Sequence, residues 1–193
     1  MGAMHKLLLP LGDEPVIRRT VRAVLGARPA EVVVVTGCNE HAVASALAGL
    51  DVRFQSNPRF EAGQMASVAA GVAALEAPSE AVMICLGDMA LLEPADYAAL
   101  AAAYATRPWG SILVPRQGAA RGNPVLFDRR LATEAIAGTR NFGCRKLIAD
   151  HPAEVYPHDP GHDRCFVDLD IPADYARLLQ RLGLAAANAV LAS

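Results

Sequence analysis

The chain has 193 residues, of which 53% are hydrophobic and 20% charged, and its formal net charge is −2. This composition predicts a globular protein with a sizeable core and excludes a disordered chain. We expect no nucleic-acid partner because the sequence has no basic block. We expect no membrane partner because no apolar run approaches the roughly 20 residues of a membrane span. The four cysteines form no C-x-x-C pair and no signal peptide is visible, which favours a reduced, cytoplasmic protein.

Short β-branched runs alternate with longer Ala/Leu-rich stretches of helical spacing. The predicted elements, in chain order, are a helix over 15–25, a strand over 31–36, a helix over 41–48, a strand over 51–55, a helix over 65–75, a strand over 81–86, a helix over 95–104, strands over 111–115 and 124–127, a strand near 165–167 and a helix over 172–182. This alternation predicts an α/β fold, with a mostly parallel sheet and helices on both faces. We expect one domain over residues 1–182 and an Ala-rich C-terminal tail over 183–193.

Three carboxylates are candidates for a metal site. In an open parallel sheet, ligands bind beyond the carboxyl ends of the strands. Asp88 follows an apolar run and a glycine there, and it can hold a magnesium ion that bridges phosphates, or serve as a turn or N-cap residue. Asp168 and Asp170 stand at i and i+2, on one side of an extended segment. Helix capping explains Asp170 or Asp174 without requiring Asp168, and the spacing leaves open which of the pair would join Asp88.

Other polar residues suit a phosphate or a nucleobase. Lys6 lies shortly after Gly2 and before a Leu-Leu-Leu-Pro turn, which suits a cation held against a phosphate beside flexible backbone. Thr36-Gly37 ends a predicted strand. Ser67, in the first turn of the helix that follows the Asn57 loop, lies where free N–H groups suit a phosphate or a base carbonyl; simple capping is the alternative.

Glycine-punctuated loops carry three more candidates: Arg121, Asn123 and Arg145. Arginines in such loops can contact an anionic ligand. Each loop taken alone is equally typical of a solvent-exposed turn.

Taken together and in order, these segments resemble the molybdenum cofactor cytidylyltransferase and guanylyltransferase-like family, the MobA-like NTP transferases. The family motifs are L-A-A-G-x-S-x-R-M-G followed by K-L-L-x-P-x-G, then N-P-x-x-x-x-G-M-x-x-S-L, L-G-D-Q-P, G-H-P-V, G-D-x-G-A-R and D-x-D-T-P-E-D-Y. The matching segments are Met1-Gly2 with Lys6–Gly12, Asn57–Val68, Leu86–Ala90, Gly122–Val125, Arg140–Arg145 and Asp168–Tyr175. The sequence departs from the family at Met89, Ala90, Asn123 and Asn141.

The resemblance implies a three-layer Rossmann-like nucleotidyltransferase fold, with the first strand and the L-A-A-G-x-S-x-R phosphate loop missing. It implies Mg²⁺-dependent transfer of CMP from CTP (or the equivalent from GTP) to a molybdopterin-type acceptor, release of pyrophosphate, and a molybdoenzyme as a further partner. The roles it implies are catalysis for Lys6 and Asp88, nucleotide binding for Gly2, Lys6, Thr36, Gly37, Asn57 and Ser67, acceptor binding for Arg121, Asn123 and Arg145, and metal binding for Asp88, Asp168 and Asp170.

Without the phosphate loop we expect weak turnover or none, because losing even one such donor costs about 10²–10³ in rate. A misassigned start would explain the missing loop, and a cloning scar is a different possible source of Met1 to Met4. The main alternative function is a non-catalytic nucleotide- or pterin-binding accessory protein for molybdoenzyme maturation. Hydride transfer is disfavoured because the sequence has no G-x-G-x-x-G fingerprint.

Overall fold

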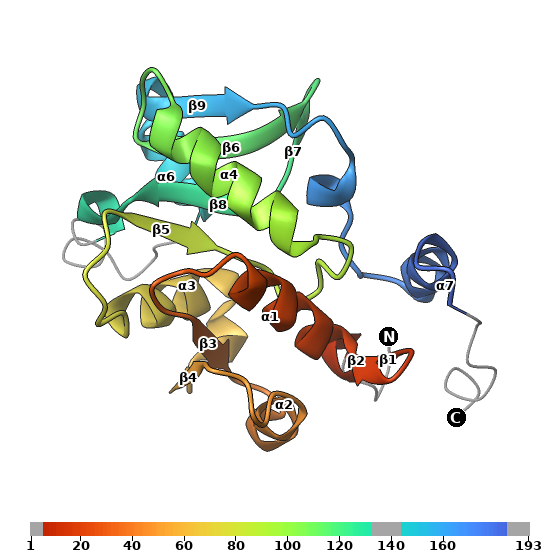
Figure 1. Cartoon of the computed structure of the whole chain (residues 1–193). Coiled ribbons are helices and arrows are strands. Elements are labelled where there is room, and N and C mark those ends of the chain that lie inside the picture. The colour runs from red at the N-terminus through yellow and green to blue at the C-terminus, as the bar shows by residue number, and fades with distance from the viewer. Residues whose placement is uncertain (1–5, 133–143, 185–193) are drawn as a thin grey trace.

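Helices flank a mixed β-sheet on both faces in the computed structural model, which describes residues 6–132 and 144–184 (Figure 1). The three-layer α/β fold expected from the sequence is therefore confirmed. The helices are α1 (Val16–Gly26), α2 (Glu40–Ala46), α3 (Gln64–Ala73), α4 (Pro94–Thr106), α6 (Cys144–Asp150) and α7 (Pro172–Arg181). The main strands are β3 (Val33–Thr36), β4 (Arg53–Ser56), β5 (Ala81–Ile84), β6 (Ile112–Gln117), β7 (Ala120–Arg121), β8 (Val125–Asp128) and β9 (Val155–His158).

The sheet is mixed because β8 runs antiparallel to both of its neighbours, β5 and β6. The strand order is β5-β8-β6, with β9 parallel to β6 and β7 forming a hairpin with it. β3 and β4 form a separate parallel pair. Among the described residues, β3 pairs only with β4 and β5 pairs only with β8, so the sheet is interrupted between β3 and β5.

One prediction near the C-terminus needs correction, and one strand there was missed. Residues 165–167 are not a strand: η4 (Arg164–Phe166) is a short 3-10 helix, and Cys165 packs among core residues of α4. The strand of this region is β9 instead, which the sequence pattern did not indicate. Pro157 interrupts its β-branched run, and proline is tolerated there because β9 lies at the edge of the sheet.

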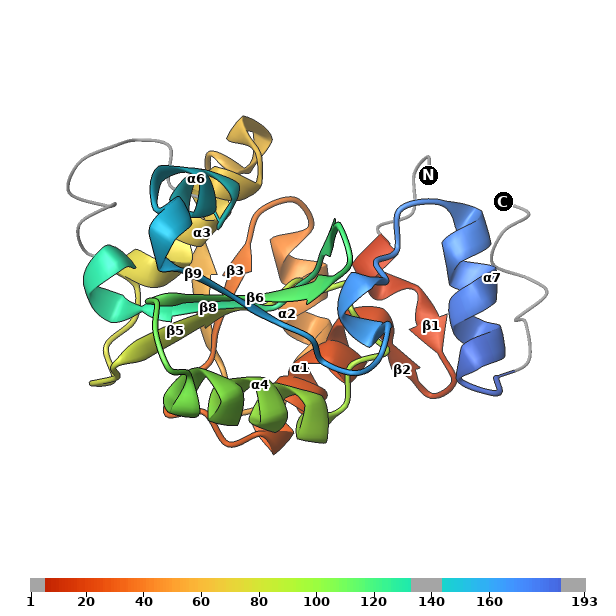
Figure 2. The same ribbon diagram turned by 90° about the horizontal axis from the view of Figure 1, so that it is seen from above.

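The two faces of the sheet are covered by different helices (Figure 2). Helices α3 and α6 cover one face, where Val68, Val72 and Leu147 join the inner side chains of β5, β6 and β8. Helices α1 and α4 cover the other. In α1 the apolar residues recur at helical spacing, so Ile17 and Val21 are buried on one side while its arginines stay outside.

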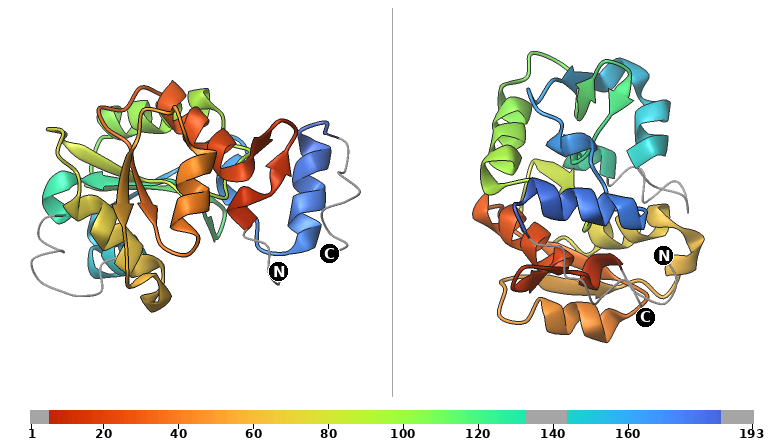
Figure 3. Two further views of the ribbon diagram at one scale, coloured as in Figure 1. Left: turned by 90° about the horizontal axis from the view of Figure 1, so that it is seen from below. Right: turned by 90° about the vertical axis from the view of Figure 1, so that its right-hand side faces the viewer.

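Helix α7 packs away from the main sheet, against the small hairpin of β1 (Pro10–Leu11) and β2 (Glu14–Pro15) (Figure 3). Tyr175 is buried there, and its hydroxyl donates to the Pro10 carbonyl. This contact fixes α7 against the hairpin that follows η1 (Lys6–Leu8). The predicted tail over 183–193 lies outside the described residues from position 185 onward. Within the described ranges, no helix is long and apolar enough to cross a bilayer.

Candidate functional site

Lys6 is held between two carboxylates that are distant from it in sequence. Its Nζ donates to Asp88 Oδ2 at 2.6 Å and to Asp170 Oδ1 at 2.9 Å. Asp88 is 8% exposed, whereas the Asp170 side chain is open to solvent. Partial burial disfavours the charge of Lys6, but the hydrogen bonds and the charges of the two carboxylates outweigh it, so the pKa of Lys6 is raised. The ammonium therefore stays charged at neutral pH.

Close packing at the end of β5 brings Lys6 to Asp88. A Cβ on Gly87 would lie 2.8 Å from Ile17 Cδ1 and 3.4 Å from Leu7 Cδ1. Only glycine therefore lets α1 and η1 approach this strand end so closely. Because Leu7 adjoins Lys6 and Gly87 adjoins Asp88, this contact sets the lysine beside the carboxylate.

The contacts of the segment that carries Asp168 and Asp170 show which aspartate caps α7. Asp174 accepts from the backbone N–H groups of Asp170 and Ile171, at 2.9 and 2.8 Å, and so caps α7. The Asp170 carboxylate is thus free to accept from Lys6. Leu169 is buried while Asp168 and Asp170 are exposed, consistent with both carboxylates lying on one side. Desolvation and repulsion from Asp170 raise the pKa of Asp168.

A second group of polar residues forms where β3 and β4 end. Asn57 is 4% exposed, and its Nδ2 donates to Ser67 Oγ at 3.1 Å. Its backbone N–H donates to the Thr36 carbonyl at 2.7 Å. These bonds fix the first turn of α3, in which Ser67 lies as predicted, against the end of β3. The fold thus brings the side chains of Asn57 and Ser67 together beside the backbone of Thr36.

Gly37 also belongs to this group, and its lack of a side chain leaves room for Phe60. A Cβ there would lie 2.5 Å from Cβ of Phe60, so the Phe60 ring can pack directly over the glycine backbone. Phe60 is 39% exposed and lies in η2 (Phe60–Ala62). The sequence analysis missed Phe60; its place between the Asn57-Pro58 loop and Gly63 was the signal that could have identified it.

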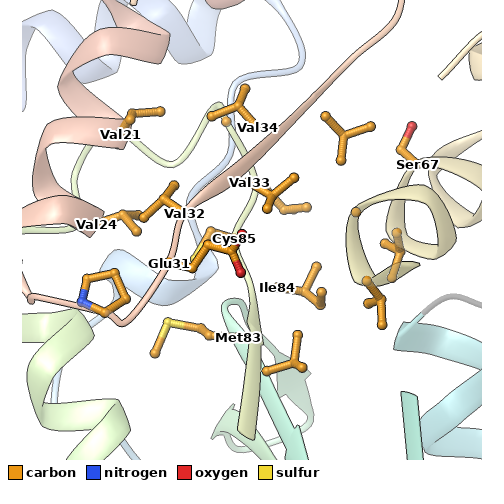
Figure 4. Close-up of a pocket in the computed structure, with 18 of the residues that line it drawn as sticks. Val21, Val24, Glu31, Val32, Val33, Val34, Ser67, Met83, Ile84 and Cys85 are labelled. Carbon is orange, nitrogen blue, oxygen red and sulfur yellow. The ribbon is translucent and has the colours of Figure 1, made fainter. Parts of the chain in front are cut away.

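A cavity of about 620 Å³ adjoins both groups. Its lining includes Leu7, Thr36, Gly37, Ser67 and Gly87. Figure 4 shows Val21 and Val24 of α1 on one side of strands β3 and β5, and Ser67 of α3 on the other. Leu7 and Gly87, which line the cavity, adjoin Lys6 and Asp88 in sequence, and Thr36, Gly37 and Ser67 of the second group line it directly.

The candidate acceptor residues lie apart from Lys6. Arg121 is exposed in β7, and the Asn123 backbone N–H donates to the Cys165 carbonyl at 2.9 Å. Arg145 is exposed on α6. Among the described residues, no hydrogen bond or ion pair joins these three side chains to Lys6, Asp88 or Asp170. Gly2 lies outside the described residues.

The cluster around Lys6 fits a divalent cation by the chemistry of its donors. Magnesium is bound in proteins by one or two carboxylates, completed by water and phosphate oxygens. Asp88 and Asp170 already converge on one positive group, the Lys6 ammonium, which occupies the place of a cation between them. Within the described part of the chain, no three His, Cys, Asp or Glu side chains form a ready metal cage. The site therefore fits a cation that also takes ligands from a substrate.

A family model and two solved structures are similar to this chain over most of its length. A family model described as the MobA-like NTP transferase domain matches residues 1–155. A solved nucleotidyl transferase from Methanothermobacter is 28% identical over 92% of this chain and 85% of its own, with a TM-score of 0.78. Rv0371c of Mycobacterium tuberculosis is 26% identical over 92% and 90%, with a TM-score of 0.72.

Two further structures are similar in fold. Rv0371c in complex with manganese is 24% identical over 92% of this chain and 93% of its own, with a TM-score of 0.68. The 4-diphosphocytidyl-2C-methyl-D-erythritol synthase of Anaerococcus prevotii is 13% identical over 90% and 88%, with a TM-score of 0.74. No curated protein matches the chain significantly.

Proposed function

Because this chain belongs to the MobA-like NTP transferase family, we propose that it transfers CMP from CTP to a molybdopterin-type acceptor. In this reaction a terminal phosphate oxygen of the acceptor attacks the α-phosphorus of CTP. The new P–O bond forms as the bond to the bridging oxygen of the β-phosphate breaks, and pyrophosphate leaves. Such chemistry depends mainly on positioning and on neutralising phosphate charge.

The observation that carries this proposal is the position of Lys6. A charged ammonium is held by Asp88 and Asp170, and the next residue, Leu7, lines the same cavity as Thr36, Gly37 and Ser67. A triphosphate at that cavity would meet a fixed positive charge. Ser67 and the Asn57 amide would lie on the nucleotide side.

Asp88 and Asp170 are the residues that would hold Mg²⁺. When bound, the ion would neutralise phosphate charge and polarise the phosphoryl oxygens. The manganese in the Rv0371c complex supports a divalent cation in this fold. Lys6, once released from the carboxylates, would then be available to the phosphates.

The acceptor site that we propose is based on the positive charge and the exposure of two arginines. Arg121 and Arg145 are exposed cations that could contact an anionic pterin phosphate, with Asn123 as a neighbouring polar group. They would orient the acceptor without touching the nucleotide. The family resemblance allows cytosine or guanine as the base, and we propose CTP as the nucleotide.

A single-turnover experiment tests the function and tolerates a slow enzyme. The chain, in excess over labelled CTP, is mixed with molybdopterin and Mg²⁺, and CMP-linked product and pyrophosphate are quantified. We expect one product per CTP, lost in Asp170→Asn and retained in Asp150→Asn, an exposed carboxylate of α6. GTP in place of CTP tests base choice. Nucleotide binding without any pyrophosphate would instead indicate the accessory, non-catalytic function.

A further inference from the structure

Phe60 is an aromatic side chain that the fold holds in place although it stays 39% exposed. Its backbone N–H donates to the Asn57 carbonyl at 3.2 Å, and its own carbonyl accepts from the Gly63 N–H at 3.1 Å. The Asn57 side chain stabilises the same turn, since its Oδ1 accepts from the Arg59 N–H at 3.0 Å. The ring is therefore carried by a hydrogen-bonded turn rather than by a loose loop.

Gly37 makes room for this side chain. A Cβ added at Gly37 would lie 2.5 Å from Cβ of Phe60 and 2.8 Å from its Cγ. Gly37 does not take the positive φ that favours glycine, whereas Gly63 does, at 93°. Position 37 therefore needs glycine for the room that it leaves, and not for its backbone conformation. Because Phe60 stays well exposed after this accommodation, burial of apolar surface does not explain the arrangement.

The Ser67 hydroxyl supplies a hydrogen-bond donor in the same cavity. Its Oγ accepts from Asn57 Nδ2 at 3.1 Å, which leaves its own hydrogen available for another partner. Among the described residues, this O–H donates to no protein acceptor. Phe60, Gly37 and Ser67 all line the cavity. An exposed aromatic face and an available O–H donor are the two groups that a flat heterocycle with ring acceptors requires.

We propose that Phe60 is the platform on which the nucleobase of the substrate stacks, with the Ser67 hydroxyl donating to an acceptor atom on the edge of the base. This inference rests on the proposed function and deepens it by naming the residue that holds the base. Because the turn already holds the ring, little conformational entropy is lost when a base stacks on it. Every base has an aromatic face, so stacking supplies affinity, and the choice between bases falls to edge contacts.

The position of the platform favours the nucleobase over the pterin ring of the acceptor. Both are flat heterocycles, and either could stack on an aromatic side chain. Phe60 shares the cavity with Gly37 and Ser67, whereas Arg121 and Arg145, which we propose for the acceptor, do not line it. We therefore assign Phe60 to the nucleotide.

Ribose 5-triphosphate, which lacks the base, isolates the contribution of stacking. Its affinity and that of CTP are measured by calorimetry for the wild type, Phe60→Ala and Phe60→Trp. We expect Phe60→Ala to weaken CTP binding about five- to hundredfold, while the affinity for ribose 5-triphosphate changes by less than about twofold. Phe60→Trp keeps an aromatic face and should bind CTP within about threefold of the wild type.

Two further variants separate stacking from a structural role. In Gly37→Ala the added Cβ would displace Phe60 without removing it, so CTP affinity should fall there too, again without loss of ribose 5-triphosphate affinity. Phe54, on the outer strand β4, is 43% exposed and does not line the cavity. Phe54→Ala should leave both affinities unchanged. A structural role of Phe60 would instead lower both affinities together with the Tm.

Cys38 offers a second readout. Its thiol is exposed and lines the cavity next to Gly37, whereas burial raises the pKa of the Cys85 thiol to about 12 and that of the Cys144 thiol to about 11. Thiols that stay protonated react slowly, so an alkylating reagent should modify Cys38 first. A base stacked on Phe60 should slow this alkylation at saturating CTP, whereas saturating ribose 5-triphosphate should not.

The results that would overturn this inference differ from those that would overturn the proposed function. Equal weakening of CTP and ribose 5-triphosphate in Phe60→Ala, or weakening of neither, would overturn the inference and leave the proposed function standing. Binding of a free pterin that depends on Phe60, together with CTP binding that does not, would assign the platform to the acceptor and overturn it too. A wild type that binds neither CTP nor ribose 5-triphosphate would contradict the proposed function itself, and this inference with it.

Discussion

The Nζ of Lys6 lies 2.6 Å from Oδ2 of Asp88, although 82 residues separate the two in sequence. Gly87 makes this contact possible by letting Ile17 and Leu7 pack against the strand end. The same ammonium reaches Asp170 at 2.9 Å. One positive charge therefore joins the N-terminal turn, the end of β5 and the segment before α7.

The contacts of Lys6 predict which carboxylate of the acidic pair binds a divalent cation. Asp170 shares Lys6 with Asp88, whereas within the described part of the chain the Asp168 side chain makes no hydrogen bond to Lys6. We expect Asp170→Asn to weaken Mn²⁺ binding by about tenfold or more, equivalent to about 1.4 kcal/mol, because it removes a carboxylate ligand. Calorimetric titration measures this. Asp168→Asn should have a smaller effect, and the reverse order would exchange their roles.

The raised pKa of Asp168 adds a pH signature to that comparison. Desolvation and repulsion from Asp170 favour its protonated form, so Asp168 becomes neutral at a higher pH than an ordinary aspartate as the solution is acidified. Its neutralisation removes a negative charge near the cation site. As the pH is lowered, Mn²⁺ affinity should therefore begin to fall at a higher pH in the wild type than in Asp168→Asn. Identical pH profiles would show that Asp168 does not act on the site.

Ser67 provides a test of the nucleotide side. Its hydroxyl accepts from Asn57 Nδ2, and replacing it by alanine leaves that buried amide without its partner. We expect Ser67→Ala to weaken nucleotide binding by about three- to tenfold, equivalent to about 1 kcal/mol for one hydrogen bond. Ser45→Ala, at an exposed position of α2, is the matched control. Unchanged CTP affinity in Ser67→Ala, measured by calorimetry, would remove Ser67 from the site.

A substitution of Asp96 tests the stability of the fold rather than the proposed reaction. It accepts from Arg164 Nε at 2.8 Å and Nη2 at 2.5 Å, and from the Glu93 backbone N–H at 2.9 Å. Burial disfavours its charge, but the Arg164 bonds and this capping bond outweigh it and lower the pKa of Asp96. Asp96→Asn should lower the free energy of unfolding by about 2–3 kcal/mol, below the usual 3–5 for a buried pair because Arg164 is partly exposed.

The sign of the pH effect follows from the lowered pKa. The stabilisation from ionised Asp96 is complete above the unfolded-state value of about 3.9, and it is lost as the pH falls through the lower folded-state value. Urea unfolding of the wild type should therefore lose stability below about pH 4 more steeply than that of Asp96→Asn. Parallel pH profiles of the two proteins would contradict the assignment.

Much of the fold could be predicted because local pattern and tertiary packing agree. The predicted helix over 15–25 became α1 (Val16–Gly26) because its apolar stripe packs against neighbouring elements. β9 was missed because Val155 and Tyr156 are followed by proline, and its pairing comes from β6, far away in sequence. A pattern of residues cannot show a partner strand that supplies the hydrogen bonds.

The sequence indicated candidate residues for the site, but not which of them would be in contact. Placement after strands singled out Asp88, Asn57 and Thr36, since carboxyl ends of strands gather at one edge. That Lys6 would bridge Asp88 and Asp170 depends on close packing at Gly87 and on Asp174 taking the capping role. Both are tertiary facts. The roles of all the candidate site residues, Gly2, Arg121, Asn123 and Arg145 included, stay predictions.

The most direct measurement of the central claim is Mn²⁺ affinity in Lys6→Met. If the Lys6 ammonium occupies the cation position between Asp88 and Asp170, removing it frees both carboxylates. Lys146→Met is the matched control, because Lys146 pairs with Asp150 on the exposed surface of α6. We predict at least about tenfold tighter Mn²⁺ binding in Lys6→Met, with no change in the control. Unchanged or weaker binding in Lys6→Met, with its Tm preserved, would contradict the account.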